Sequence, residues 1–406
     1  SEMCIRDRIQ TLPLEYWKLI KEALVELTRN FNTYVIMMTA TMPLIFKEGA
    51  MELVKDARKY FTELGRSMYR YVGRNGMTVS NLAEFAVKTW QEQRSVLVIV
   101  NTIPTSIRVY REILDRLNQR RLVRIGVDEQ ALNDEISHVV AYLSTNIVPK
   151  ERLRRIRLLR ELLHRERKVL VVSTQLVEAG VDLDFDCVIR DIGPIDSIVQ
   201  AGGRCNREWR KEKGIVYIVR LSEEGRVQDS VKIYGNLAIR NITLPLLEKR
   251  WSEFTESELP DLFEEYSDLL LNKFRYDASD KSNNLLNAVR DLELAKVAEF
   301  KLLEEEPKIP VFVELDCEAQ RVLLEFRRLW DRRQSGRTDF EYWVQLRAAR
   351  VRLEEYIVET WYSDGLPQQI IAEGVDIRYI PYSEMATYYD TETGLRLEYG
   401  PSPTIW

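Results

Sequence analysis

Two arginines, Arg204 and Arg207, are the residues of this chain whose type and spacing best suit a chemical role. They stand three apart in the run QAGGRCNR, which begins at Gln200. A guanidinium is planar, permanently charged and able to bond two phosphate oxygens at once. Arginines placed in this way stabilise charge on a transferring phosphoryl group, and they often come from a domain other than the one that holds the nucleotide. Taken alone, the run is equally compatible with a helix that carries surface arginines.

Polar residues also follow several short apolar runs of the chain. One motif, TQLVEAGVD, extends from Thr174 to Asp182, and the others are Thr39-Ala40-Thr41, the stretch 101–106 and the pair Ser144-Thr145. Each of these alone is more typical of a turn or a helix cap than of a binding motif. Ligands of parallel α/β sheets bind at the carboxyl ends of strands. Since every motif follows a predicted strand, we expect all of them, the two arginines included, to gather at one edge of a sheet.

The elements that must position these residues alternate between strand and helix over residues 94–222. Apolar runs predict strands at 95–100, 139–143, 168–173, 187–190 and 214–220. Amphipathic patterns between them predict helices, one of them from about Pro149 and another begun by Pro194. Ser80 is a plausible N-cap for a further helix that ends near Glu92. The alternation predicts a largely parallel sheet with helices on both faces.

The flanking segments have other patterns. Helical spacing predicts a helix from Pro13 to Asn30, and the short apolar run at 34–38 predicts a buried strand. Residues 49–93 are predicted to form connecting helices. After residue 222 helical periodicity prevails over 227–305 and 317–362, with a strand at 308–314 and short strands and loops in the Tyr-, Gly- and Pro-rich end. We therefore expect a mostly helical C-terminal accessory domain with a few strands over 223–406. Residues 1–8 resemble a non-native scar, which we exclude from fold reasoning.

Composition limits the classes of function. The chain has 406 residues, 45% of them hydrophobic and 30% charged, as in globular proteins. Its net charge of −5, from 59 basic and 64 acidic residues, excludes nucleic-acid binding by bulk electrostatics. Any nucleic acid must be held locally, by main-chain amides, helix ends and a confined groove. The arginine-rich stretch 150–170 and the acidic stretch 253–268 read as solvated helix faces.

The sequence gives little support for a metal site or a membrane-spanning segment. The four cysteines form no CxxC pair, so neither a zinc site nor a disulfide framework is predicted. The two histidines are too few for an HD-type metal nuclease within this chain. No apolar run is long enough to span a membrane and no stretch has the form of a signal peptide, so we expect a cytoplasmic protein with no membrane partner.

The order of the motifs, T-x5-G-x-D and then Q-x2-G-R-x2-R, resembles motifs V and VI of superfamily 2 helicases. The stretch from Val171 to Arg207 closely resembles the CRISPR-associated helicase–nuclease of type I interference systems. Further matching runs are IQTLP from Ile9, YLST from Tyr142 and YYDTETGL from Tyr388. The resemblance implies that two RecA-like domains clamp ATP with Mg²⁺ and move along single-stranded DNA. It also implies a type I surveillance complex and an HD nuclease domain or subunit as partners.

The resemblance implies roles for individual residues. The catalytic residues facing the γ-phosphate would be Gln200, Arg204 and Arg207. Gly180, Asp182 and Gly203 would lie near the nucleotide. The nucleic-acid contacts would be Asn101, Thr102, Ser144, Thr145 and Thr174. Thr39 and Thr41 would couple the nucleotide state of the first domain, of which only the last helix and strand are expected here (9–48), to the second domain (94–222). No protein ligand for a metal is implied within the chain.

The chain departs from the family pattern at the nucleotide. No run matches GxxxxGK[ST], the loop that cradles phosphates, and Arg8 stands where an acidic pair is needed. ATP would therefore be bound mainly by the missing first domain, and we expect this fragment alone to be inactive. The sequence favours the C-terminal portion of an ATP-dependent single-stranded-DNA translocase. Another superfamily 2 motor of repair or restriction and a non-catalytic, partner-binding RecA-like module stay open as alternatives.

Overall fold

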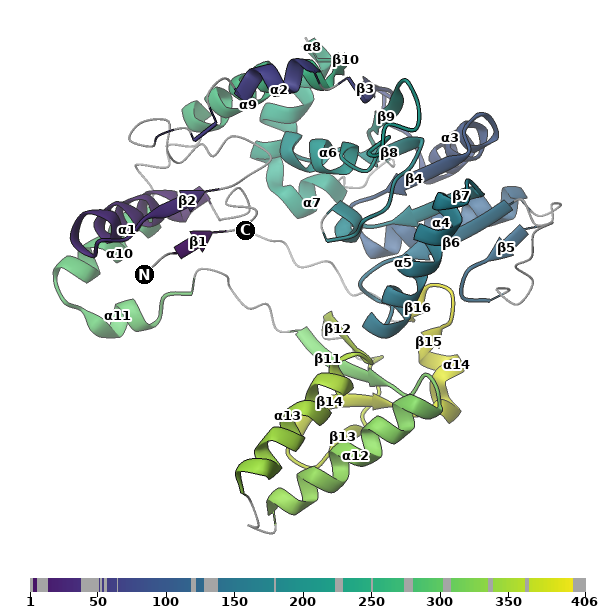
Figure 1. Cartoon of the computed structure of the whole chain (residues 1–406), viewed down its shortest axis with the longest axis vertical. Helices are drawn as coiled ribbons and strands as arrows, with labels where there is room; N and C mark the ends of the chain where they lie inside the picture. Colours follow the sequence, from purple (N-terminus) through teal and green to yellow (C-terminus); the bar gives the residue numbers. More distant parts are fainter. Residues whose placement is uncertain are drawn as a thin grey trace.

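The computed structural model (Figure 1) describes residues 3–5, 14–37, 51, 53–54, 57–63, 65–117, 122–127, 138–178, 180–222, 229–249, 251–273, 280–301, 308–334, 339–361 and 365–396. These residues form an eight-stranded sheet, a four-stranded sheet and two pairs of short strands. Among the helices in these ranges, none has the length and apolar character required to cross a membrane. The larger sheet positions most of the predicted site residues.

The larger sheet has the strand order β10-β3-β9-β8-β4-β7-β6-β5. Its strands are β3 (Ser67–Tyr71), β4 (Ser95–Ile99), β5 (Leu122–Arg124), β6 (His138–Leu143), β7 (Lys168–Ser173), β8 (Cys187–Asp191), β9 (Gly214–Val219) and β10 (Glu253–Thr255). Neighbouring strands run parallel, apart from the antiparallel pair of β10 and β3 at one edge. The predicted parallel sheet is confirmed.

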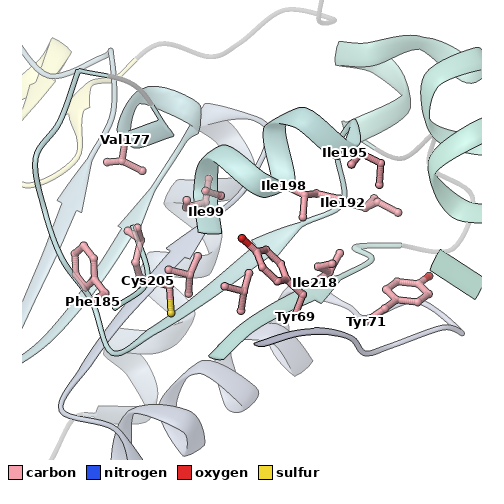
Figure 2. Packing of buried hydrophobic residues seen from close by; sticks show 14 of the residues in the cluster. Tyr69, Tyr71, Ile99, Val177, Phe185, Ile192, Ile195, Ile198, Cys205 and Ile218 are labelled. Carbon is pink, nitrogen blue, oxygen red and sulfur yellow. The ribbon is translucent and has the colours of Figure 1, made fainter. Parts of the chain in front are cut away.

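Helices cover both faces of this sheet, which explains why its central strands read as unbroken apolar runs. Along β4, Leu97 and Ile99 join the core on one face, and Val96 and Val98 join the core on the other. The second face is covered by α3 (Val79–Glu92) and α4 (Ile103–Leu117), and the first by α5 (Pro149–His164), α6 (Ile195–Gly202), α8 (Leu244–Lys249) and α9 (Leu259–Lys273). Figure 2 shows Ile195 and Ile198 of α6 in the first core, with Ile99 and Ile218 of the sheet.

Parts of the sheet were not predicted. Strands β5 and β10 have three residues each and form the two edges of the sheet, and β3 alternates buried with partly exposed side chains. None of the three contains the unbroken apolar run that marks the central strands. Because β3 and β10 belong to this sheet, it takes in strands from outside residues 94–222. The predicted cap of α3 is also wrong. The side chain of Thr78, not that of Ser80, accepts the hydrogen bond from the Asn81 amide, at 3.1 Å.

The smaller sheet lies in the C-terminal region and has the order β12-β11-β14-β13. Its strands are β11 (Lys308–Val313), β12 (Ile357–Trp361), β13 (Ile370–Ala372) and β14 (Val375–Ile380), and its helices are α12 (Cys317–Gln334) and α13 (Phe340–Glu354). The helical prediction for 317–362 is wrong for β12, whose β-branched residues pair antiparallel with β11. A hairpin of β15 (Tyr389–Asp390) and β16 (Gly394–Leu395) then returns to the larger sheet, as Figure 1 shows.

The N-terminal helix packs on a distant segment. The elements η2 (Leu14–Tyr16) and α1 (Trp17–Asn30) contact α10 (Asp280–Arg290). The Lys18 ammonium donates to the Asn283 side chain at 2.7 Å, and the rings of Tyr16 and Phe300 meet edge to face at 5.1 Å. Residues 3–5, within the stretch excluded as a scar, form β1 (Met3–Ile5) in parallel with β2 (Val35–Met37).

Candidate nucleotide and nucleic-acid site

The chain that follows β7 forms a tight turn and then runs back to the start of β8. The turn is a short 3-10 helix, η5 (Gln175–Glu178), in which Val177 is buried. Gly180 follows with a φ of +71° and an exposed position, and an added Cβ there would meet no atom within 4 Å. Only glycine adopts this left-handed backbone without strain, so the residue type serves the turn.

Arg204 joins this turn to the end of α6. Its Nε donates to the Val177 carbonyl at 2.8 Å, and its Nη2 donates to the Glu178 carbonyl at 3.0 Å. The Arg204 carbonyl accepts from the Phe185 amide at 2.9 Å, beside the bridge between Phe185 and Cys205. Figure 2 shows Val177, Phe185 and Cys205 near α6. Arg204 is therefore partly buried and fixes the two motifs to each other.

Arg207 stands at the surface next to the same segment. Its side chain is 43% exposed, and its Nη1 lies 3.0 Å from Oδ1 of Asp182, which is itself 66% exposed. An exposed ion pair of this kind contributes about 0–1 kcal/mol, so an incoming anion competes for the guanidinium at little cost. The backbone around Arg207 is held more firmly. Asp184 accepts from the amides of Arg207 at 2.7 Å and Glu208 at 3.2 Å, and burial raises the pKa of Asp184.

The structure separates the two groups of predicted residues, which we had expected at one sheet edge. Because α6 runs antiparallel to the strands, it returns Arg204 and Arg207 to the amino end of β8, beside Phe185. Asn101, Ser144 and Thr174 follow the carboxyl ends of β4, β6 and β7. The expectation of a single edge is wrong for the arginines. The turn η5 links the two groups.

The predicted nucleic-acid contacts differ in exposure. Thr145 is exposed and Thr102 partly so, whereas Asn101, Ser144 and Thr174 are buried. Thr102 accepts from the Thr105 amide at 3.3 Å, near the start of α4, and donates to Asp229 at 2.8 Å. In this conformation the side chain that reaches outward is that of Thr145. Contact of all five with nucleic acid stays a prediction.

Asn101 belongs to a buried polar network that the sequence did not reveal. Its Nδ2 donates to Asp191 at 2.6 Å, and its Oδ1 accepts from Nη1 of Arg190 at 2.6 Å. Arg190 is fully buried, forms an ion pair with Glu178 at 2.9 Å and donates to Ser197 at 2.9 Å. An arginine followed by an aspartate inside an apolar strand was the available signal, since a buried charge requires partners.

Burial shifts the titration of two acids near this network. It raises the pKa of Asp191 to about 7, although the amides of Leu221 and Ile192 and the Arg190 charge oppose the shift. Burial likewise raises the pKa of Asp196, at the start of α6, to about 6. Both acids therefore hold protons at a pH at which an exposed aspartate is ionised.

The remaining predicted residues are placed as follows. Gln200 is partly buried on α6, and Gly203 is the C-cap of that helix, with its amide bonded to the Val199 carbonyl at 2.9 Å. Thr39 and Thr41 lie outside the described residues. Over the described ranges, no cluster of three or more His, Cys, Asp or Glu side chains is arranged to hold a metal ion. Of the predicted catalytic and nucleotide groups, Gly180, Asp182 and Arg207 are exposed together.

Comparison with known proteins identifies similar sequences. A family model described as the C-terminal part of the CRISPR-associated nuclease/helicase Cas3 matches residues 92–210. The CRISPR-associated nuclease/helicase Cas3 of Haloferax volcanii is 27% identical over 394 residues, covering 74% of this chain and 41% of that protein. The protein of the same name from Methanothermobacter thermautotrophicus is 26% identical over 220 residues, covering 50% of this chain and 23% of that protein.

Solved structures show the fold. The crystal structure of T. fusca Cas3 with ATP matches with a TM-score of 0.51 at 15% identity, over 78% of this chain and 39% of that one. Without the nucleotide, T. fusca Cas3 matches with a TM-score of 0.51 at 14% identity, over 78% of this chain and 40% of that one. This chain thus spans less than half the length of these relatives. The predicted resemblance is confirmed: the chain is similar to the C-terminal part of the CRISPR-associated nuclease/helicases, and its larger sheet is RecA-like.

Proposed function

We propose that this chain is the C-terminal portion of an ATP-dependent motor of type I CRISPR defence that moves along single-stranded DNA. The observation that carries the proposal is the anchoring of Arg204 on the carbonyls of Val177 and Glu178. It rigidly joins the predicted phosphate-facing arginines to the turn that follows β7. The relatives are named nuclease/helicases, and T. fusca Cas3, whose fold is similar, was solved with ATP.

In this proposal the two arginines have different tasks. Arg207 is the arginine finger, which exchanges its surface ion pair with Asp182 for the γ-phosphate. Arg204 fixes the position of the segment that carries Arg207 relative to the turn η5. Gly180 lets the backbone approach the nucleotide closely. Gln200 and Gly203 complete the group at the end of α6. ATP and Mg²⁺ are held mainly by a first RecA-like domain, so residues 1–406 alone do not hydrolyse ATP.

Nucleic acid would lie along the carboxyl ends of β4, β6 and β7. The exposed hydroxyl of Thr145 and the partly exposed Thr102 would bond phosphates together with main-chain amides. The buried Asn101, Ser144 and Thr174 would act by shaping these strand ends. We assign 94–222 to the second RecA-like domain, 9–48 to the end of the first, 49–93 to the connection and 223–406 to an accessory domain. The connection and the accessory region also supply β3, β10, α8 and α9 to the sheet and core of the second domain. The partners would be a surveillance complex and an HD nuclease domain or subunit, in the cytoplasm.

The test combines this chain with a separately expressed first RecA-like domain from a family member. DNA-stimulated ATP hydrolysis is measured for the unaltered chain and for Arg207→Lys, which keeps the charge but loses the two-pronged geometry. Arginine fingers contribute about a thousandfold or more to turnover, so we expect Arg207→Lys to lose nearly all activity. The matched control is Arg165→Lys, because Arg165 is 60% exposed and also paired with one surface acid, Glu161.

Three outcomes would contradict the proposal. Equal activity of the two lysine variants would remove Arg207 from the reaction. Hydrolysis by residues 1–406 without any added domain would show that the chain holds ATP by itself. Failure of ATP to crosslink to the combined domains, with or without DNA, would favour the non-catalytic partner-binding module.

A further inference from the structure

The turn that follows β6 is clamped by a hairpin from the far end of the chain. We propose that this hairpin, β15–β16, and the buried Arg155 are positioning elements that set the turn, residues 144–148, for contact with single-stranded DNA. The inference rests on the proposed function, because it takes Thr145 as the exposed contact. It assigns to residues 389–395 a role in DNA binding rather than in the phosphoryl-transfer step.

Arg155 connects the hairpin to the sheet. It lies on α5 with a side chain that is 0% exposed, and its Nε pairs with Glu151 at 2.8 Å. Its Nη1 donates to the Tyr142 carbonyl at 3.0 Å and to the Glu392 carbonyl at 2.7 Å, and its Nη2 donates to the Thr391 carbonyl. A buried cation with one acid and three carbonyls fixes its neighbours firmly, since every lost contact leaves charge unsolvated.

The sheet leaves room for the hairpin at this position. Strand β5 pairs with β6 only as far as Val140, so the β5 side of β6 is open near Tyr142. Gly126 follows β5 with a φ of +100°, and an added Cβ there would meet Nη2 of Arg155 at 2.6 Å and the Thr391 carbonyl at 2.7 Å. The hairpin therefore replaces a continued β5 at the end of β6, directly before the turn.

The hairpin also bonds the turn itself. The Asn146 side chain donates to the Thr393 carbonyl at 2.6 Å, and the Leu395 amide donates to the Asn146 carbonyl at 2.9 Å. Gly394 has a φ of +88°, and an added Cβ there would lie 2.3 Å from the Asn146 carbonyl oxygen. Backbone meets backbone at this contact, so no larger residue fits without displacing the turn.

The smaller sheet also contacts the end of the turn. Val148 packs in one core with Val311, Val358 and Ile380 of that sheet. The Lys150 amide donates to the Glu355 carbonyl at 2.9 Å. Between these contacts Thr145 is exposed while Ser144 and Asn146 are buried. The outward direction of Thr145 is thus set by C-terminal residues that themselves need not touch DNA.

The test is Gly394→Ala in the full chain, compared with Gly374→Ala. Both glycines have a left-handed backbone, but an added Cβ at Gly374 meets no atom within 4 Å, so only Gly394→Ala pushes on the turn. Binding of a fluorescent oligothymidylate is measured by anisotropy, and hydrogen exchange is followed in peptides that cover 144–148. We expect Gly394→Ala to weaken binding roughly tenfold, equivalent to one charged hydrogen bond, and to speed exchange in the turn. Gly374→Ala should change neither.

A second variant decides the matter if Gly394→Ala does not fold. Tyr110→Phe removes the hydroxyl that donates to Glu392 at 2.6 Å and leaves no cavity, so it loosens the hairpin more gently. We expect a few-fold loss of affinity with faster exchange in the same peptides. Faster exchange with unchanged affinity would overturn the inference alone, as would no change in either measurement. No binding by the unaltered chain would overturn the proposed function and the inference with it.

Discussion

Replacement of Arg190 by methionine tests the buried network beneath the motifs. Arg190 is fully buried and bonds Asn101, Ser197 and Tyr234 at 2.6, 2.9 and 3.1 Å, besides its ion pair with Glu178 at 2.9 Å. Methionine fills similar volume but leaves the Glu178 carboxylate, 8% exposed, without its counter-charge. Breaking a buried pair in this way costs about 3–5 kcal/mol of the free energy of unfolding.

The interaction energy between Arg190 and Glu178 is measured by a double-mutant cycle. Glu178→Gln keeps an oxygen to accept from Ser197, as Glu178 does at 2.9 Å, but removes the charge. We expect Arg190→Met combined with Glu178→Gln to be more stable than the sum of the single losses predicts, by about 2 kcal/mol. The assay is native-state hydrogen exchange of β4 and β8 amides, with urea unfolding followed by tryptophan fluorescence.

The experiment includes a matched control variant and an outcome that would contradict the role of the network. Arg165→Met removes an arginine that is 60% exposed, so it should change stability by less than about 0.5 kcal/mol. A loss below about 1 kcal/mol for Arg190→Met, or single losses that simply add, would show that the network does not hold the strand ends together.

Three further predictions concern the same region. Since burial raises the pKa of Asp191 to about 7 and that of Asp196 to about 6, the folded chain holds protons that the unfolded chain releases. Stability should therefore fall as pH rises from about 4 to 7, and Asp191 should contribute at most about 1.4 kcal/mol per unit of this slope. Urea midpoints of Asp191→Asn should lose that contribution and keep the part due to Asp196. Asp184→Ala should speed exchange of the two amides that its carboxylate accepts from and cost about 1–2 kcal/mol; unchanged exchange would refute that anchoring. Gly202→Ala should cost more in thermal unfolding than Gly180→Ala, because its Cβ would lie 2.1 Å from the Tyr69 hydroxyl whereas that of Gly180 meets nothing; equal losses would contradict this packing.

Much of the larger sheet could be predicted because its information is local. The apolar runs of β4 and β7 are buried on both faces, and the amphipathic α4 and α5 follow from helical spacing. The strands β3 and β10 could not be predicted in this way. They exist because distant partners complete their hydrogen bonds: β3 pairs with β9 and β10, which are far away in the sequence. The edge strand β10, with three residues, carries little periodic signal of its own.

The sequence by itself determined the identity and order of the motifs, the parallel sheet and the resemblance to the nuclease/helicases, since these depend on residue types and short spacings. Only the tertiary structure decided what each motif residue contacts. It turned Asn101 inward to Arg190, returned Arg204 to the amino end of β8 and brought residues 389–395 to the turn after β6. The physical reason is that buried polar groups take whichever partners the packed chain provides, and in this fold those partners come from segments far apart in the sequence.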